Sequence, residues 1–267
     1  MGAVLGQGVG IRLGWQGRSV AYAAETLALS ARFSVQATPT RLRWIDAMIV
    51  RLKLVGVWPK LDALYLLAAH DAQAARQNWV ANACNLTAVS SPTFSSDLGY
   101  IGDGFSAYLE TGFNPATASS PKYAQSSAHL GLWSLTALAA SGIDMGNGNS
   151  LVLARQTSSD LSVGRVNLAS SHGSTLPSAG VGHFVANRTG ATDMRSFADG
   201  AVASPNNGLS SIPPDNSAIR IGGRSGAVSY SLRRIAAAHY GSGLSDQNIA
   251  DLYTAIRTYL RDVGAVA

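Results

Sequence analysis

The segment that decides the fold is IAAAHYGSGLSDQNIADLYTAIRTYLRDV, residues 235–263. It begins as an apolar strand from Ile235 to His239. It ends as a helix, because Ser245 is a good N-cap and Asp246 favours the positive end of the helix dipole. The apolar face of this helix recurs at spacings of three and four, and consists of Ile249, Leu252, Tyr253, Ile256, Leu260 and Val263. This order predicts a β-structure closed by a packed helix.

Short alternating runs, separated by turn residues, extend upstream of this segment to Asn85. Asp199-Gly200 is a dipeptide that favours a tight hairpin turn. Many short strands with regular turn signals indicate a sandwich or barrel. We therefore predict a mainly β fold, an antiparallel two-sheet jelly-roll sandwich over about residues 85–240, with an N-terminal helical segment and a C-terminal helix.

The first 84 residues have a different pattern, with three predicted helices after a Gly-rich lead. The first runs from Ser19 to about Phe33. The second has Thr38 as its N-cap and Pro39 at its first position, and the third runs from Pro59 to about Asn78. The sequence thus predicts two parts, residues 1–84 and 85–267.

All of the excess positive charge lies in residues 1–80, which hold nine Lys and Arg against four Asp and Glu. The remaining residues hold eleven of each. Such an asymmetry favours two parts with different partners. The second helix has an apolar stripe with basic edges, for which docking on another protein is the preferred interpretation over nucleic acid. Its predicted assembly residues are Arg41, Leu42, Arg43, Ile45, Ile49, Arg51, Leu52 and Lys53.

Composition excludes several classes of protein. Charged residues make up 13% and hydrophobic residues 46% of the chain, which is incompatible with disorder. The single cysteine, Cys84, excludes an intrachain disulfide and a Cys-based zinc site. Since there is no apolar run of 18 residues and the first 14 residues lack a basic n-region, we expect neither a membrane helix nor a signal peptide.

A family resemblance follows from the order of these elements. The hairpin at Met194–Ala203, the run Ile219–Gly223, the strand Ile235–Tyr240 and the helix start LSDQNIADLY at Leu244–Tyr253 resemble the C-terminal part of concanavalin A-like, laminin-G-like jelly rolls. The segment Val57–Trp79 resembles proteins encoded by phages and prophages.

These resemblances imply a structural or adhesive protein of a bacteriophage virion, a fibre or a decoration, assembled in the host cytoplasm. Its partners would be other virion proteins and host surface polysaccharide, with a homo-oligomeric state. Two alternatives remain open: a depolymerase acting on envelope polysaccharide, and a decoration with no ligand.

The supply of acids argues against an enzyme. Glycoside hydrolysis by the usual route needs two carboxylates that flank one bond. The chain has two glutamates, Glu25 and Glu110, and Glu25 falls in a predicted helix outside the sandwich. We therefore predict no catalytic residues and no enzyme, with Glu110 as the first residue to suspect if activity exists.

Loop residues are the candidates for ligand binding, because loops carry variable contacts on a rigid frame. No cofactor is expected other than calcium, for which Asp103, Asp144 and Asp160 are the predicted oxygen ligands. A glycan-binding site would use an aromatic ring of the protein to stack on the sugar and side-chain amides to form hydrogen bonds with it. The predicted glycan-binding residues are Tyr123, Asn147, Asn149, Asn206 and Asn207.

Overall fold

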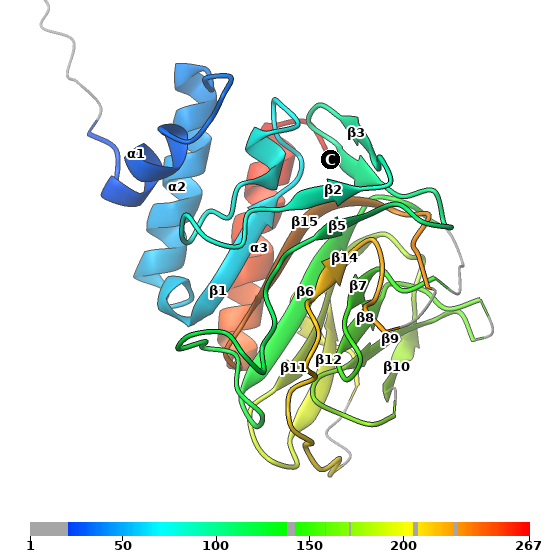
Figure 1. Cartoon of the computed structure of the whole chain (residues 1–267). Helices are drawn as coiled ribbons and strands as arrows, with labels where there is room; N and C mark the ends of the chain where they lie inside the picture. Colours follow the sequence, from blue (N-terminus) through cyan, green and yellow to red (C-terminus); the bar gives the residue numbers. More distant parts are fainter. Residues whose placement is uncertain (1–20, 138–141, 158, 171, 205–207, 227–228) are drawn as a thin grey trace, which may run out of the picture.

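The predicted sandwich is confirmed. The computed structural model describes residues 21–137, 142–157, 159–170, 172–204, 208–226 and 229–267. Within these residues the chain forms two sheets, of eight and seven strands, in which every paired strand is antiparallel. Three α-helices lie on the outside of the larger sheet, and the smaller sheet lies on its other side (Figure 1).

The larger sheet has the strand order β13-β12-β11-β6-β15-β4-β3, and β1 also pairs with β15. Its strands are β1 (Leu61–Leu66), β3 (Thr93–Ser95), β4 (Gly99–Ile101), β6 (Ala128–Ser134), β11 (Gly182–Arg188), β12 (Met194–Ala198), β13 (Ala201–Val202) and β15 (Arg234–Gly241). The predicted hairpin turn is present between β12 and β13, where Asp199 and Gly200 have φ angles of 48° and 82°.

The smaller sheet has the order β10-β9-β8-β7-β14-β5-β2. Its strands are β2 (Thr87–Val89), β5 (Tyr108–Glu110), β7 (Met145–Gly146), β8 (Leu151–Leu153), β9 (Leu161–Arg165), β10 (His172–Pro177) and β14 (Arg220–Ile221). The side chains of Leu109, Val152 and Ile221 are buried in the main core. This sheet therefore forms the second apolar face that the alternating strands of the larger sheet require.

The C-terminal helix α3 (Asp246–Asp262) begins as predicted, because the Ser245 hydroxyl accepts a hydrogen bond from the Asn248 amide. Its Tyr253 ring stacks on Trp133 of β6, with the two ring planes 4° apart. Ile256 and Leu260 have no exposed surface. The helix therefore covers the face of the larger sheet that points away from the smaller sheet.

Helices α1 (Ala24–Ser30) and α2 (Pro39–Leu54) are also present, together with short 3-10 helices at Trp58–Lys60 and Ala74–Arg76. Thr38 caps α2 through the Arg41 amide, as predicted. The first residue of α1 has no capping side chain of its own. Instead Asp46 of α2 accepts hydrogen bonds from the Ala23 amide and the Thr26 hydroxyl, which joins the two helices.

The prediction of a helix from Pro59 to Asn78 is wrong. The first part of this segment instead forms the strand β1, which pairs with β15 inside the larger sheet, and only the 3-10 turns at Trp58–Lys60 and Ala74–Arg76 are helical. Leu64, Tyr65 and Leu66 have no exposed surface, so both faces of the strand are covered. A strand that is buried on both faces is a continuous apolar run without alternation, and its periodicity does not distinguish it from a buried helix.

The predicted assembly surface on α2 needs a correction. Ile45, Ile49 and Leu52 are buried in the protein's own core, where α2 packs on α3, and Leu42 is partly buried against the same core. These side chains cannot bind another subunit while the chain is folded.

The basic residues of α2 have partners within the chain as well. Arg41 is buried and pairs with Asp97, while Arg51 pairs with Asp251 of α3. Lys53 pairs with Glu25 of α1, and Arg43 is exposed and donates to the Thr40 hydroxyl. Homo-oligomerisation and docking on virion proteins stay predictions, but these eight residues no longer support them.

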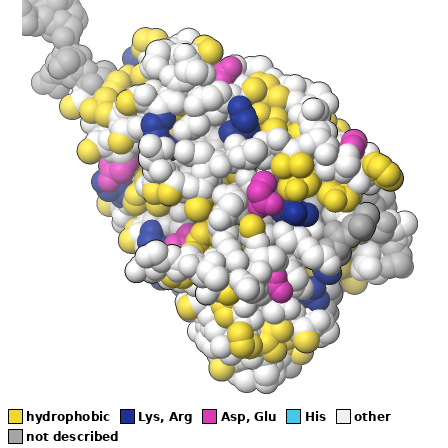
Figure 2. Space-filling model, in the orientation of Figure 1, with side chains coloured by type: hydrophobic (Ala, Val, Ile, Leu, Met, Phe, Trp, Pro, Cys, Tyr) yellow, Lys and Arg dark blue, Asp and Glu magenta, His cyan; other side chains and the backbone are white. Residues whose placement is uncertain are grey.

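The main hydrophobic core also crosses the predicted boundary after residue 84, since it joins Leu29 and Ile49 to Leu130 and Ile256. Figure 2 shows that charged side chains are few and scattered on the viewed face. No helix in the described part of the chain is long and apolar enough to cross a membrane.

Candidate functional site

The candidate site is a cleft of about 420 Å³ at one end of the sandwich. Three stretches of chain form its walls: the start of β1, the residues that follow the second 3-10 helix, and the loop between β5 and β6. Its volume lies in the range of small-molecule sites, about 300–1,000 Å³. The lining residues are Asp62, Asn78, Ala81, Ala83, Cys84, Gly112, Phe113, Asn114, Thr117, Ala118, Ser119, Ser120 and Pro121.

Asp62 fixes one wall of the cleft. Its two carboxylate oxygens accept hydrogen bonds from the backbone amides of Lys122 and Tyr123, each at 2.8 Å. Burial raises the pKa of Asp62, while these amides and the charge of Lys122 oppose the rise. The carboxylate thus holds the end of the β5–β6 loop against β1.

Asn78 fixes the opposite wall. Its side-chain oxygen accepts hydrogen bonds from the amides of Leu64 and Val80, and its side-chain nitrogen donates to the carbonyls of Asp62 and Ala83. One side chain therefore satisfies four backbone groups that no strand pairs. Residues 78–84 are held beside β1 in this way.

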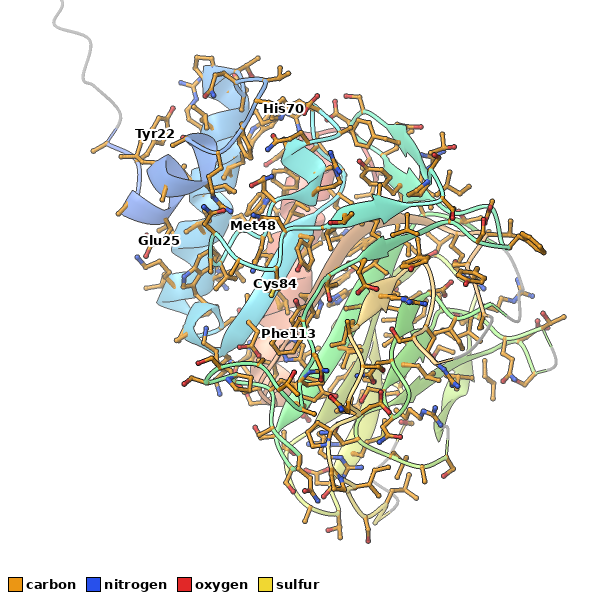
Figure 3. The ribbon with its side chains drawn as sticks, viewed as in Figure 1. Tyr22, Glu25, Met48, His70, Cys84 and Phe113 are labelled. Atoms are coloured by element: carbon orange, nitrogen blue, oxygen red, sulfur yellow. The ribbon has the colours of Figure 1, made fainter. Side chains whose placement is uncertain are left out.

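Cys84 and Phe113 lie near each other at the cleft (Figure 3). The Cys84 carbonyl accepts a hydrogen bond from the Tyr65 hydroxyl at 2.6 Å. Burial raises the pKa of the Cys84 thiol, and the charge of Asp62 adds to the rise. The thiol is therefore a poor nucleophile at neutral pH.

The β5–β6 loop carries the polar side chains of the cleft. Phe113 anchors it, with 6% of its surface exposed and its ring 4.7 Å from that of Tyr240. Beyond this anchor, Asn114 is partly exposed, and its side-chain nitrogen donates to Asn216. Exposed hydroxyls follow on Thr117, Ser119 and Ser120.

The prediction that Tyr123 and Asn147 bind a glycan is wrong. Tyr123 has 1% of its surface exposed, and its hydroxyl bonds Ser150 and Asn167, so its ring cannot stack on a sugar. Asn147 has no exposed surface, because its amide holds the turn between β7 and β8.

The other predicted glycan residues are less constrained. Asn149 is partly exposed and donates to the Pro213 carbonyl. Asn206 and Asn207 lie outside the described residues. The loop that holds Tyr123 nevertheless lines the cleft through its earlier residues.

The predicted calcium ligands do not meet at one site. In the described part of the chain, no group of three or more His, Cys, Asp or Glu side chains is placed to hold a metal ion. Asp103 accepts the amides of residues 105–107, which lowers its pKa well below the usual range, and Asp160 pairs with Arg155.

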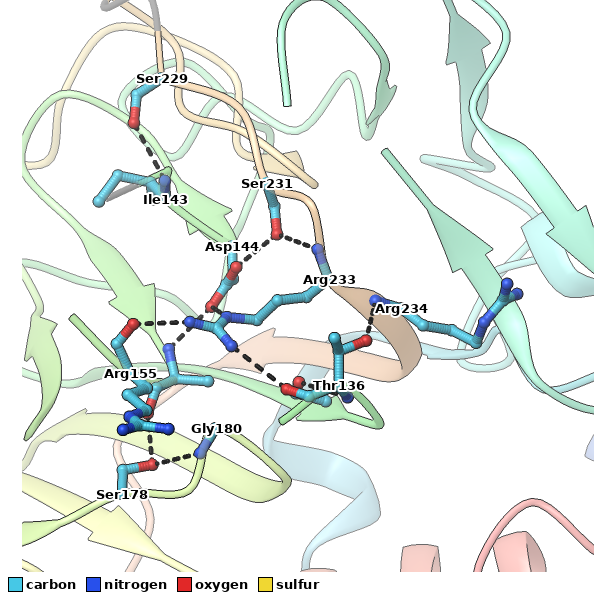
Figure 4. A network of polar contacts seen from close by, with 12 residues as sticks. Thr136, Ile143, Asp144, Arg155, Ser178, Gly180, Ser229, Ser231, Arg233 and Arg234 are labelled. Atoms are coloured by element: carbon cyan, nitrogen blue, oxygen red, sulfur yellow. Dashed lines mark hydrogen bonds and ion pairs between the residues drawn. The ribbon is translucent and has the colours of Figure 1, made fainter. Parts of the chain in front are cut away.

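Asp144 has a structural role instead (Figure 4). It has no exposed surface, and its carboxylate accepts hydrogen bonds from Arg233, Ser231 and the amide of Ala154. Both oxygens are therefore occupied.

Three histidines that showed no ligand spacing in the sequence come together in the larger sheet. His183 and His239 lie with their Nε2 atoms 2.8 Å apart, and the rings of His129 and His239 are 5.1 Å apart. All three are fully buried. Gly131 leaves the space for His239, since a Cβ at this glycine would lie 2.2 Å from that ring.

Comparisons with known proteins bear on the fold. No model of a protein family and no curated protein matches the sequence. Among solved structures, the chain is similar to Trypanosoma rangeli sialidase, with a TM-score of 0.50, 12% identity, and coverage of 79% of this chain and 39% of that one. A mutant of this sialidase displaying trans-sialidase activity gives a TM-score of 0.51, 12% identity, and coverage of 82% and 39%.

A further similarity is to domain 4 of AbnA, an extracellular arabinanase from Geobacillus stearothermophilus, in complex with arabinotriose. Its TM-score is 0.42 at 13% identity, with coverage of 72% of this chain and 98% of that one. This score is too low to support an argument. The chain spans about two fifths of the length of the sialidase chains that it resembles.

The prediction that the chain is not an enzyme therefore has to be corrected. It rested on the shortage of acidic residues, but the solved structures that share this fold include sialidases, which are enzymes. Glu110 pairs with Arg220 on the smaller sheet and does not line the cleft. The chain shares an antiparallel sandwich fold with part of a sialidase chain.

Proposed function

We propose that the chain binds a glycan and that a short stretch of sugar occupies the cleft between β1 and the β5–β6 loop. The observation that carries this proposal is the lining of the cleft. Amides, hydroxyls and one carboxylate alternate there with small apolar side chains. A sugar ring presents hydroxyls at its edge and C–H groups on its faces, so a mixed lining matches both.

The rigidity of the walls supports the same proposal. The side chains of Asp62 and Asn78 form hydrogen bonds with backbone groups of the two walls and hold them in place. The hydroxyls of Thr117, Ser119 and Ser120 remain exposed on the loop. A preformed cleft loses little conformational freedom when a ligand enters.

A glycan array followed by calorimetry tests the proposal. Ala83 is exposed and lines the cleft, so Ala83→Trp should fill it and weaken sugar binding at least about tenfold. The matched control is Ala201→Trp on β13, an exposed residue at the opposite edge of the larger sheet, which should bind as the unchanged protein does.

Two results would contradict this function. One is an absence of binding to a broad panel of sugars, which would favour a decoration without a ligand. The other is unchanged affinity in Ala83→Trp, which would place the sugar elsewhere. Release of smaller sugars during the measurement would instead identify turnover, the depolymerase alternative.

The finer assignment, to an adhesive protein of a bacteriophage particle, rests on the sequence resemblance of Val57–Trp79 alone. It predicts that the chain is found in purified particles, which mass spectrometry of such particles would detect. The cleft does not depend on this assignment.

A further inference from the structure

A second group of polar side chains lies on the outer face of the smaller sheet. Along β9, Gly164 packs against Ala186 of the larger sheet, whereas Val163 belongs to a small apolar cluster separate from the main core. Arg165 alternates with Gly164 and thus shares the outer face with Val163. Its cross-strand neighbour on β8 is Leu151, a member of the same outer cluster.

Arg165 is held rigidly at this place. Its side chain is buried, with 8% of the residue exposed. Nη1 donates to the carbonyl of Ala169 at 3.0 Å, and Nη2 donates to the carbonyl of Gly148 at 2.6 Å. The Nε atom, although buried, has no hydrogen-bond partner. A buried guanidinium N–H without a partner is costly and rare in folded proteins.

Arg224 is a second arginine with unused donors. Its backbone forms a bridge with Gly146 of β7, two residues before the Gly148 that binds Arg165. Its Nε is also buried without a partner, and its guanidinium makes no hydrogen bond or ion pair with any described residue. Arg224 as a residue is partly exposed, although its Nε is not.

The two arginines act on each other. Burial is the main cause that lowers the pKa of Arg165, the charge of Arg224 lowers it further, and Asp215 raises it. Asp215 lies beside Gly148, since a Cβ at this glycine would be 2.2 Å from its carboxylate. The group therefore holds two positive charges and one negative charge, and keeps a net positive charge.

We propose that Arg165 and Arg224 bind a small oxyanion, the carboxylate or sulfate group of an acidic ligand, on the outer face of the smaller sheet. Guanidinium groups match the oxygen spacing of such anions and form strong charge-assisted hydrogen bonds with them. An anion bound here would offset the excess positive charge. This site is separate from the cleft and does not depend on it.

The neighbouring arginine Arg220 is not part of the proposed site. Arg220 on β14 is engaged, because it pairs with Glu110 at 3.1 Å and its guanidinium lies 4.3 Å from the centre of the Tyr108 ring. It is thus neutralised and stacked. Arg224 has no comparable partner among the described residues, so its replacement breaks no ion pair with them.

Thermal unfolding of the full chain in sulfate, in glucuronate and in chloride at matched ionic strength tests the proposal. A ligand that binds the folded state raises Tm with its concentration, so sulfate or glucuronate should stabilise beyond chloride. If sulfate stabilises more, the site prefers a tetrahedral sulfate group. If glucuronate stabilises more, the site prefers a planar carboxylate. Arg224→Gln should weaken this binding about tenfold or more, as expected for the loss of a charge-assisted hydrogen bond.

Two further variants sharpen the result. Asp215→Asn removes the negative charge beside the arginines and should tighten binding, which a merely structural role for Arg224 would not produce. Arg43→Gln, on α2, removes a charge far from this sheet and should leave the response unchanged. Equal stabilisation by chloride, or an unchanged response in Arg224→Gln, would overturn the proposal. A cleft filled by Ala83→Trp should not affect it.

Discussion

Asp144 and Arg233 form an ion pair in which neither side chain has any exposed surface. Arg233 also donates to the carbonyls of Thr136 and Arg155, so each of its three nitrogens has a partner. The pair lies where the chain enters β7 and β15, strands near the middle of the two sheets. A buried charge pair of this kind ties together segments that are 89 residues apart.

Removal of one partner of this ion pair should therefore strongly lower the free energy of unfolding. Asp144→Ala leaves the Arg233 charge buried without compensation, and we expect the free energy of unfolding to fall by about 3–5 kcal/mol. The control is Lys53→Ala, which breaks an ion pair whose lysine is 44% exposed and should cost about 1 kcal/mol or less. Urea denaturation measures both. Equal losses in the two variants would argue against a special role for Asp144.

The buried histidines predict a loss of stability in mild acid. Burial lowers the pKa of His129 to about 4 and that of His183 to about 3, and it holds the pKa of His239 well below the usual range. Below about pH 6.5 the unfolded chain binds protons that the folded chain does not. Stability present above that pH is therefore lost as the pH falls toward 4.

Each such histidine contributes a slope of about 1.4 kcal/mol per pH unit once the unfolded state is protonated. Denaturant unfolding at a series of pH values from about 7.5 to about 4.5, a range that spans the histidine pKa of about 6.5 in the unfolded chain, should show this decline. His183→Gln removes one of the titrating groups and should reduce the slope. A stability that stays flat over this range would show that the histidines are solvated.

At the scale of elements, α3 is held to the larger sheet by its apolar face. Ile256 has no exposed surface, so Ile256→Ala leaves a cavity and should cost about 2–5 kcal/mol of unfolding free energy. Arg257, the next residue, is exposed, and Arg257→Ala should change stability by about 0.5 kcal/mol or less. Thermal or urea unfolding compares the two. A small effect at Ile256 would mean that the helix is not part of the cooperative unit.

For the whole molecule, the position of β1 changes what truncation should do. A fragment that begins at Asn82 lacks α2 and β1, although β1 pairs with β15 and every β1 residue except Asp62 has no exposed surface. We expect this fragment to lose cooperative unfolding, because β15 gains an open edge and the core loses one wall. Circular dichroism during heating measures the transition. A sharp transition would instead support the predicted division after residue 84.

The sequence by itself determined the elements whose signals are local. The capped helix after Ser245, the capped helix after Thr38 and the Asp199-Gly200 hairpin all occur where the pattern predicts them. Each depends on side chains within a few residues of one another. The alternating strands likewise predicted a two-sheet sandwich, because period-two apolarity requires a second face.

Only the tertiary structure decided the rest. Leu61–Leu66 is a strand because it pairs with β15 inside the larger sheet and all but one of its residues are buried, which no local pattern records. The cleft depends on Asp62 reaching Lys122 across 60 residues, and the arginine site depends on loops that bring Arg224 close to Arg165. Long-range contacts of this kind are set by chain topology, so the spacing of residues along the chain cannot reveal them.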